Sequence, residues 1–250
     1  MTRCPPICIC VRETLDWGNE AAVQAGLIRD FLPKYEMWNR TFNVPYHRFR
    51  QRLKEIAEAT LRGVEGARVV ARAEVPPGAL VVPVDDDDWF APDLAARLAA
   101  AWDESLRGYR WLSHILEARP PGLLGLLRRG RPVTPVADGS RFTCTSNNYA
   151  FVALGDARDL VRSHAEASRR FDASPEGVRR LPLSLSLQNR NLASQTALAW
   201  GKPTIPRSKL LRRYRRYRSL YDRVALPADL SWARRGVAAM ADLMRELKPR

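Results

Sequence analysis

The sequence predicts an α/β fold in which a mainly parallel sheet is flanked by helices. Short apolar runs alternate along the chain with stretches of helical periodicity, a pattern typical of parallel strands joined by helices. One apolar run, residues 81–84, ends in four adjacent carboxylates at 85–88, and a predicted helix follows. Ligands bind open α/β sheets beyond the carboxyl ends of strands, so we expect the functional site at this acidic segment.

The elements upstream of the acidic segment follow from apolar runs and helix breakers. We expect Pro33 to stop the first helix and Gly63 to stop the second. A turn at 76–78 then leads into the central strand. The predicted elements are strands over 6–11 and 68–73 and helices over 20–31 and 46–61.

The elements downstream begin with a helix over 92–107, which has Pro92 in its first turn. Residues 109–116 are apolar but do not distinguish a strand from a helix. We expect residues 175–190 to be irregular, and the chain beyond Pro206 to form helices attached to the α/β core. The other predicted elements are strands over 142–145 and 149–154 and helices over 157–171 and 192–200.

The composition is that of a globular protein with one sizeable core. The chain has 250 residues, and its hydrophobic share of 46% argues against wholesale disorder. It contains no apolar run of about 18 residues, which argues against a transmembrane helix. The amino terminus lacks the apolar region and cleavage site of a signal peptide, so we expect a cytoplasmic protein.

The chain is strongly basic, with a formal net charge of +14 at pH 7. Such a charge predicts attraction to nucleic acid, to anionic membranes or to phosphorylated substrates. The excess is concentrated between Arg207 and Arg223, where eight basic residues face only Asp222. This short segment is therefore a candidate contact surface.

The four cysteines are predicted to be free thiols that act as small buried hydrophobic side chains. Cys8 and Cys10 share one face of the predicted first strand, with Cys4 nearby and Cys144 far along the chain. Three clustered thiols without a paired second cluster are a poor signature of zinc.

The acidic segment, 85–88, has three chemical interpretations. As a solvated turn it needs no function. Carboxylates at a strand end also occur in two-metal phosphoesterases and nucleases, which recruit further Asp, Glu or His, but this chain has only three histidines. If the carboxylates form a metal site, a cation relieves the repulsion among them. Oxygen ligands favour Mg²⁺ or Mn²⁺. The third interpretation is a sugar-nucleotide site.

This third interpretation comes from a family resemblance. Residues 84–94 (Val-Asp-Asp-Asp-Asp-Trp-Phe-Ala-Pro-Asp-Leu) resemble the Asp-x-Asp-Asp segment of glycosyltransferases of the GT-A type, including bacterial rhamnosyltransferase-like proteins. In that family the motif follows a buried strand and is commonly trailed by an apolar residue, a proline and a leucine. The resemblance implies a Rossmann-like catalytic domain over 1–205, with a basic helical extension over 206–250 packed on it.

The resemblance also implies roles for individual residues. Asp85 is expected on the nucleotide side near the ribose, with Asp86 beside it, and Asp87 is expected to bind the metal ion. Asp88 is a second ligand or a support, although Asp86 and Asp88 form an alternative operative pair. His164 corresponds to a further metal ligand in some members, whereas a histidine on a helix more often lies on the surface or packs.

A sugar transfer that inverts the anomeric centre needs in addition a carboxylate base that deprotonates the acceptor hydroxyl. The candidates downstream of the motif are Glu166, Asp172 and Glu176. The segment Ser146-Asn147-Asn148 between two predicted strands either presents amides to a sugar or acceptor or is simply a turn.

The segment 207–223 is predicted to form a basic amphipathic helix, and several roles are open to it. It can lie on an anionic membrane where lipid-linked acceptors reside, or bind nucleic acid through phosphates. It can equally pack its tyrosines on the core, or direct one cation to the donor diphosphate. The side chains at helical spacing are Leu210, Tyr214, Tyr217 and Tyr221.

The predicted function is therefore metal-dependent transfer of a sugar from a nucleoside diphosphate donor to an acceptor hydroxyl, with Mn²⁺ or Mg²⁺ as cofactor. The acceptor is a glycan, a lipid-linked molecule or a small molecule, and peripheral contact with the membrane runs through 207–223. A polyanion-binding protein without enzymatic activity is the alternative, and a metal-dependent phosphoesterase or nuclease is third. Motifs of P-loop nucleotidases, α/β-hydrolases, zinc proteases and Rossmann dehydrogenases are absent.

Overall fold

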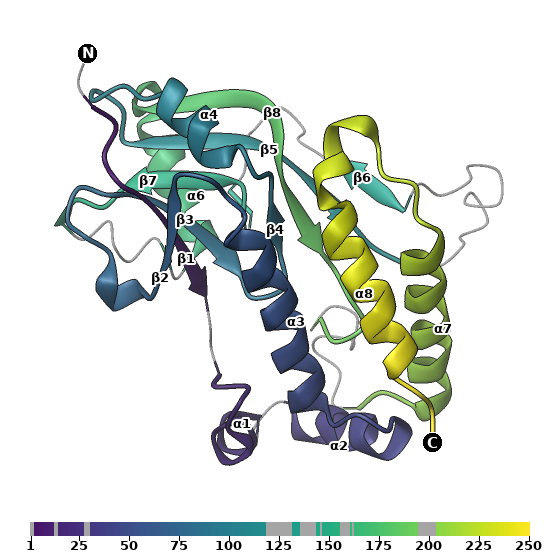
Figure 1. Ribbon diagram of the computed structural model, residues 1–250. Coiled ribbons are helices and arrows are strands. Elements are labelled where there is room, and N and C mark those ends of the chain that lie inside the picture. Colours follow the sequence, from purple (N-terminus) through teal and green to yellow (C-terminus); the bar gives the residue numbers. More distant parts are fainter. Residues whose placement is uncertain are drawn as a thin grey trace.

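The protein is a mixed α/β fold in which helices cover both faces of a sheet (Figure 1). This arrangement comes from a computed structural model of the chain. The predicted α/β class is confirmed at this level. The structure describes residues 3–12, 15–27, 31–118, 132–135, 144–145, 147–155, 161, 163–194 and 204–250.

The strands of the described residues join into one eight-stranded sheet, in the order β2-β1-β3-β7-β5-β8-β4, with β6 paired to β5. Three pairings are parallel (β1 with β2, β1 with β3, and β5 with β8), and four are antiparallel (β3 with β7, β5 with β7, β5 with β6, and β4 with β8). The sheet is therefore mixed, and the expected mainly parallel arrangement is not confirmed. The strands are β1 (Ile7–Arg12), β2 (Ala67–Val70), β3 (Leu80–Asp85), β4 (Trp89–Phe90), β5 (Gly108–Leu116), β6 (Val133–Pro135), β7 (Tyr149–Val152) and β8 (Val178–Asn189).

Strands β1 and β3 lie side by side in the centre of the parallel part, and both faces of each are covered. A strand that is buried on both faces reads as a continuous apolar run, which is why the sequence located both. Ile7 and Ile9 pack on one face, whereas Cys8 and Cys10 pack on the other. Both thiols are buried, as predicted, and burial raises the pKa of Cys10 to about 11.

Helix α3 begins and ends at the predicted residues, but the segment before it differs from the prediction. Pro33 was expected to end a helix, whereas it lies in the first turn of a separate helix, α2. The first turn tolerates proline because its N–H groups have no partner within the helix. The helices are α1 (Glu20–Leu27), α2 (Leu32–Thr41), α3 (Tyr46–Leu61), α4 (Leu94–Ala100), α6 (His164–Ala173), α7 (Arg207–Arg223) and α8 (Arg234–Glu246).

Helices α7 and α8 lie next to each other and pack with α2 and α3 around a shared apolar core (Figure 1). This core includes Trp38 from α2, Tyr217 from α7 and Met240 from α8. Helix α8 also approaches β4 closely, because a Cβ atom at Gly236 would lie 3.0 Å from the ring of Trp89. The carboxyl-terminal helices therefore pack directly against the strand that follows the acidic segment.

Several predicted boundaries need correction. Residues 178–189 form the long strand β8, although an irregular segment was predicted there. Its Pro182 lies at a register shift against β5, and such irregularities are where a strand tolerates proline. The ambiguous segment 109–116 belongs to strand β5, and the helix predicted over 92–107 is shorter.

Other predicted elements extend outside the described residues. Positions 142–143, 157–160 and 195–200, from a strand and two helices, lie there. In the described part of the chain, no helix combines the length and the apolar character needed to cross a bilayer.

Candidate functional site

The candidate site is the acidic turn, which we define as residues Asp85 to Asp88 between β3 and β4. The turn is closed by a hydrogen bond from the backbone N of Asp88 to the carbonyl oxygen of Asp85, at 3.2 Å. It follows the carboxyl end of β3, as the sequence predicted. All four carboxylates are therefore gathered at one edge of the parallel part of the sheet.

Asp85 is the outermost carboxylate and is held by strand β1. Arg12 is its partner in the parallel register, and its Nη2 lies 2.9 Å from Oδ1 of Asp85. The Asp85 side chain is 45% exposed, whereas that of Arg12 is 12% exposed. Desolvation raises the pKa of Asp85 above its ordinary value, although Arg12 opposes the shift. Asp85 thus keeps oxygen atoms open to solvent.

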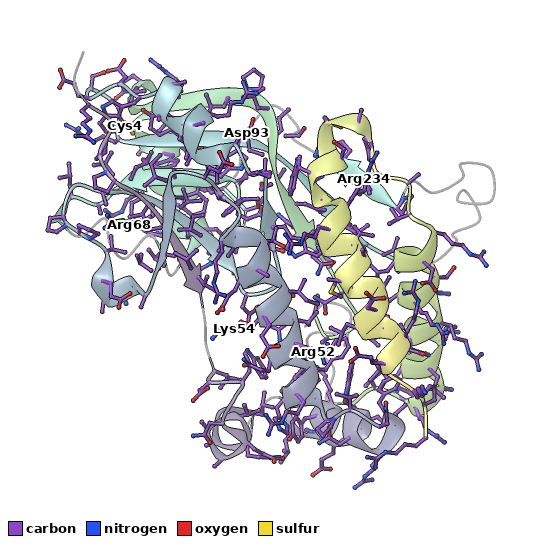
Figure 2. The ribbon with its side chains drawn as sticks, in the orientation of Figure 1. Cys4, Arg52, Lys54, Arg68, Asp93 and Arg234 are labelled. Carbon is purple, nitrogen blue, oxygen red and sulfur yellow. The ribbon has the colours of Figure 1, made fainter. Side chains whose placement is uncertain are left out.

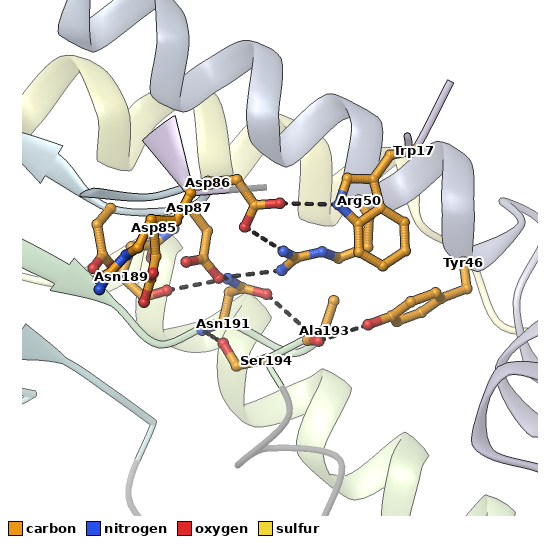
Figure 3. Close-up of polar contacts among 12 residues, drawn as sticks. Trp17, Tyr46, Arg50, Asp85, Asp86, Asp87, Asn189, Asn191, Ala193 and Ser194 are labelled. Atoms are coloured by element: carbon orange, nitrogen blue, oxygen red, sulfur yellow. Dashed lines mark hydrogen bonds and ion pairs between the residues drawn. The ribbon is translucent and has the colours of Figure 1, made fainter. Parts of the chain in front are cut away.

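Asp86 and Asp87 share one cation, Arg50 from helix α3 (Figure 3). The guanidinium forms a short ion pair with Asp86, and its Nη1 lies 3.2 Å from Oδ2 of Asp87. Trp17 completes the arrangement because its Nε1 donates to Asp86 at 2.9 Å. The Trp17 ring also lies 4.9 Å from the guanidinium carbon, within range of a cation–π contact.

Burial and mutual contact shift the pKa values of both Arg50 and Asp87. Burial alone would lower the pKa of Arg50, but Asp86 and Asp87 more than compensate and raise it. Burial raises the pKa of Asp87 to about 6; Arg50 opposes this rise, whereas Asp86 and Asp85 add to it. One guanidinium therefore does not fully offset the cost of placing these carboxylates together.

The end of β8 and the loop after it hold the other side of the acidic turn. The Nδ2 of Asn191 donates to Asp87 at 2.8 Å, and the backbone N of Asn189 donates to Asp88 at 2.9 Å. Asn189 is fixed in turn by the phenol of Tyr221 from helix α7, which donates to its Oδ1 at 2.7 Å. All three of these side chains are buried, so α7 supports the turn through one intermediate residue.

His164 begins helix α6 close enough to the turn to respond to its charges. Burial lowers the pKa of His164, with Arg12 lowering it further and Asp85 opposing the shift. The predicted metal ligands Asp87, Asp88 and His164 do not form one cluster. Among the described residues, no three His, Cys, Asp or Glu side chains converge enough to enclose a metal ion.

The predicted base candidates lie on or just after helix α6, and their described contacts are with arginines outside the acidic turn. Glu166 pairs with Arg170 at 3.1 Å and also with Arg169. Asp172 lies 3.0 Å from Arg110, and Glu176 is exposed beyond the helix. Their assignment as general base stays a prediction.

The amides predicted between the two strands bond in part to the protein itself. Oδ1 of Asn147 accepts a hydrogen bond from Ser113 at 3.0 Å, and Nδ2 of Asn148 donates to the carbonyl of Trp111 at 3.3 Å. Both asparagines are buried, and Ser146 lies outside the described residues. Nδ2 of Asn147 has no hydrogen-bond partner among the described residues, so both the turn and the amide-presenting interpretation stay predictions.

A divalent ion fits this turn only if it takes most of its ligands from elsewhere. The accessible oxygens belong to Asp85 and, at 14% exposure, Asp87, whereas the side chain of Asp86 is 9% exposed. Mg²⁺ is commonly held by one or two carboxylates together with substrate phosphates and water. The donor set therefore suits an ion that binds together with a phosphate-bearing substrate.

Sequence reasoning missed the partners of the carboxylates. A signal existed for Arg50, because it lies on the same face of α3 as the buried Leu53, Ala57 and Leu61. A charged residue at a core-facing position indicates a buried partner. Arg12 had a similar signal, since it ends the apolar run of a strand parallel to β3. The role of Asn191 had none, because its contact with Asp87 links distant parts of the chain.

A scan of protein-family models finds no match to this chain. No curated protein sequence matches it either.

Proposed function

We propose that the protein transfers a sugar from a nucleoside diphosphate donor to an acceptor hydroxyl, with a divalent cation bound at the acidic turn. The observation that carries the proposal is an excess of acid at this turn. Four carboxylates meet there, and the described residues contribute two arginines, Arg12 and Arg50, as ion-pair partners of Asp85, Asp86 and Asp87. A divalent cation has the charge that would balance this excess when all four are ionised.

The exposure of the carboxylates supports the pair Asp85 and Asp87 as the residues that hold the ion. Their side chains are more exposed than that of Asp86, and Asp88 accepts a hydrogen bond from the last residue of β8. When bound, the ion supplies Lewis-acid stabilisation to the negative charge of the departing diphosphate. The alternative pair, Asp86 and Asp88, is directed into the protein.

The surrounding residues contribute rigidity and charge. Arg50 and Asn191 hold Asp87, so its carboxylate is oriented before any ligand binds. Arg12 lies beside Asp85 and adds positive charge next to the expected position of the diphosphate. These contacts favour a rigid turn that binds one class of ligand over a mobile acidic loop.

Glu166 and Asp172 are the candidates for the general base. Glu166 lies in the first turn of α6 and pairs with Arg169 and Arg170. Asp172 lies nearer the end of the helix, against Arg110. In either assignment the carboxylate accepts the proton of the acceptor hydroxyl as the new glycosidic bond forms.

The phosphoesterase and nuclease alternative receives less support. Two-metal enzymes of that kind gather several carboxylates and histidines around adjacent ions. In the described part of the chain, the acidic turn and His164 do not make such a cluster. A single ion completed by substrate phosphates demands fewer protein ligands.

The proposal is tested by calorimetric titration of UDP, GDP, TDP and CMP, each with and without Mn²⁺. We expect saturable binding of one nucleotide that requires the ion. Asp87→Asn should weaken this binding by about tenfold or more, because a neutral amide is a poor ligand for a hard cation. Asp93→Asn is the matched control, since Asp93 is exposed and pairs only with Arg97 among the described contacts.

A second comparison resolves which pair of carboxylates operates. Asp85→Asn should weaken metal-dependent binding more than Asp88→Asn if the more exposed pair holds the ion. Thermal melting of each variant checks that it folds. Binding that is indifferent to Mn²⁺, or no binding across the panel, would contradict the proposed transfer reaction.

A further inference from the structure

Helix α7 presents a basic face to solvent and an apolar face to the core. Its outer face, which we define as Arg212, Arg215, Ser219 and Arg223, is exposed. Arg212, Arg215 and Arg223 are separated by three and eight residues, so they share one side of the helix. The buried side chains are Leu210, Tyr214, Tyr217, Leu220 and Tyr221, as expected if the tyrosines pack on the core.

The charges of this outer face lack partners within the described chain. Arg212, Arg215 and Arg223 form no ion pair or hydrogen bond with the residues that the structure describes. The one acid of the helix, Asp222, lies 2.9 Å from Arg245 of α8. The nearby acids of α8 are also engaged, because Asp242 pairs with Arg245 and Glu246 pairs with Arg52. Figure 2 labels Arg52 on α3.

The arginines also act on one another. Arg213 lies between the outer face and the core, and its Nη1 is buried without a hydrogen-bond partner. Burial lowers the pKa of Arg213; Tyr217 opposes this effect, whereas Arg216 and Arg212 lower the pKa further. Like charges three and four residues apart destabilise a helix. An anionic partner would relieve this repulsion.

An open hollow lies on the flank of the outer face and is suited to a phosphate group. Its volume is about 370 Å³, and its lining includes Arg215, Arg218, Ser219 and Arg223. Asp222 also lines it, and its carboxylate is paired with Arg245. Arg218 donates to the phenol of Tyr214 at 3.2 Å. Guanidinium groups that converge on a hollow can bond several phosphate oxygens.

We propose that the outer face of α7 docks the protein on an anionic membrane surface through lipid phosphates, without insertion into the bilayer. Helix α7 lies at the outside of the molecule with α8 on one side (Figure 1), and Arg212, Arg215 and Arg223 are exposed among the described residues. Leu210, Leu220 and the tyrosines of α7 are buried and Leu211 is half-buried against the core, so the outer face itself offers charge and hydroxyl groups. This inference does not depend on sugar transfer at the acidic turn.

A lipid surface fits this face better than a single-stranded nucleic acid does. Proteins that bind single strands stack bases on aromatic side chains, and the tyrosines of α7 are buried. Phosphates on a flat surface require only the exposed cations that the helix supplies. A duplex also offers phosphates, and arginine commonly reads its guanines, so duplex binding is the competing outcome of the test below.

The expected binding is electrostatic in every respect. Each arginine near an anionic membrane contributes about fivefold to the partition coefficient, so three contribute about a hundredfold. Binding should fall steeply between 50 and 300 mM salt, because screening shortens the range of these interactions. Since no apolar group inserts, vesicle curvature should have little effect.

The test is co-sedimentation of the full chain with vesicles of phosphatidylglycerol and phosphatidylcholine, or of phosphatidylcholine alone. The test variant is Arg212→Gln with Arg215→Gln and Arg223→Gln. The matched control removes the same charge elsewhere through Arg40→Gln, Arg62→Gln and Arg97→Gln, at exposed residues that are all ion-paired. Glutamine is a good helix former, and circular dichroism checks that both triple variants are folded.

We expect the wild-type chain to bind vesicles that contain phosphatidylglycerol and not vesicles of phosphatidylcholine alone. The test variant should lose about a hundredfold in affinity, whereas the control variant should lose much less. Equal losses in the two variants would mean that total charge matters and not this face, and would overturn the proposal. Absence of binding at 50 mM salt would do the same. If a DNA or RNA duplex displaced the chain from vesicles and bound more tightly at equal salt, the face would be assigned to nucleic acid instead.

Discussion

The acidic turn and the outer face of α7 are two highly charged regions, and they treat their charges in opposite ways. Asp86 and Asp87 are largely buried and bond to a guanidinium that is buried with them. Arg212, Arg215 and Arg223 are exposed and form no ion pair with described residues. The turn is thus organised by the chain itself, whereas the helix leaves its charges to solvent or to a partner.

The difference follows from where each charge lies. A charge removed from water needs a nearby opposite charge and hydrogen bonds, because desolvation costs several kcal/mol, roughly, for each ion. An exposed charge keeps its hydration and needs no partner. The two regions are nevertheless connected, since Tyr221 on the inner side of α7 bonds to Asn189 beside the turn. The same helix supports one region and displays the other.

The largest effect that we expect comes from removing the cation of the turn. Arg50→Met keeps an unbranched apolar stem but leaves Asp86 and Asp87 buried without their guanidinium. Breaking a buried ion pair on one side costs about 3–5 kcal/mol. Urea unfolding followed by circular dichroism should show a loss of that size in the free energy of unfolding.

Arg52→Met is the matched control, two residues along the same helix. Arg52 is exposed and pairs with Glu246 at 3.1 Å, so its loss should cost about 1 kcal/mol or less. Arg50→Lys, which keeps one charge but loses the two-nitrogen contact, should fall between them. Equal costs for Arg50→Met and Arg52→Met would show that the turn does not depend on its internal cation.

A smaller effect is expected at the connection between the two regions. Tyr221→Phe removes the donor to Oδ1 of Asn189 and leaves a buried acceptor unsatisfied. Such a loss costs about 1–3 kcal/mol. Tyr214→Phe is the control, because the Tyr214 phenol donates to the carbonyl of Met244 at 3.5 Å, a much longer contact whose loss should cost less. If thermal and urea unfolding rank the two variants equally, Asn189 is not supported by α7.

The acidic turn was visible in the sequence because its position depends on local patterns. The apolar runs of β1 and β3 are continuous, and the carboxylates follow one of them directly. Helix α3 was predicted to its ends, because its apolar spacing is regular and Pro45 precedes it. Such features are decided by residues close together in the chain.

The partners of the turn and the sheet order depend on contacts between distant residues. Asn191 reaches Asp87 only because β8 runs beside β4. Strand β8 was not predicted, because Pro182 interrupts its alternating leucines and proline is unusual inside a strand. The sequence of a single strand does not show whether its neighbours in the sheet run parallel or antiparallel to it. The base assignment to Glu166 or Asp172 likewise depends on how α6 faces the turn with a substrate bound.

The smallest effect is expected on α7 and has the opposite sign. Arg212 lies three and four residues from Arg215 and Arg216, and each such repulsion costs about 0.2–0.5 kcal/mol. Arg212→Gln should therefore raise the free energy of unfolding by a few tenths of a kcal/mol, roughly, at 20 mM salt, and the gain should vanish at 500 mM. Arg62→Gln is the control, because it removes an ion pair of 2.9 Å with Glu58 and should lower stability slightly. Urea titrations at both salt concentrations show whether each variant is more or less stable than the wild type. A lower free energy of unfolding for Arg212→Gln would mean that other groups of the chain balance the charge of the outer face.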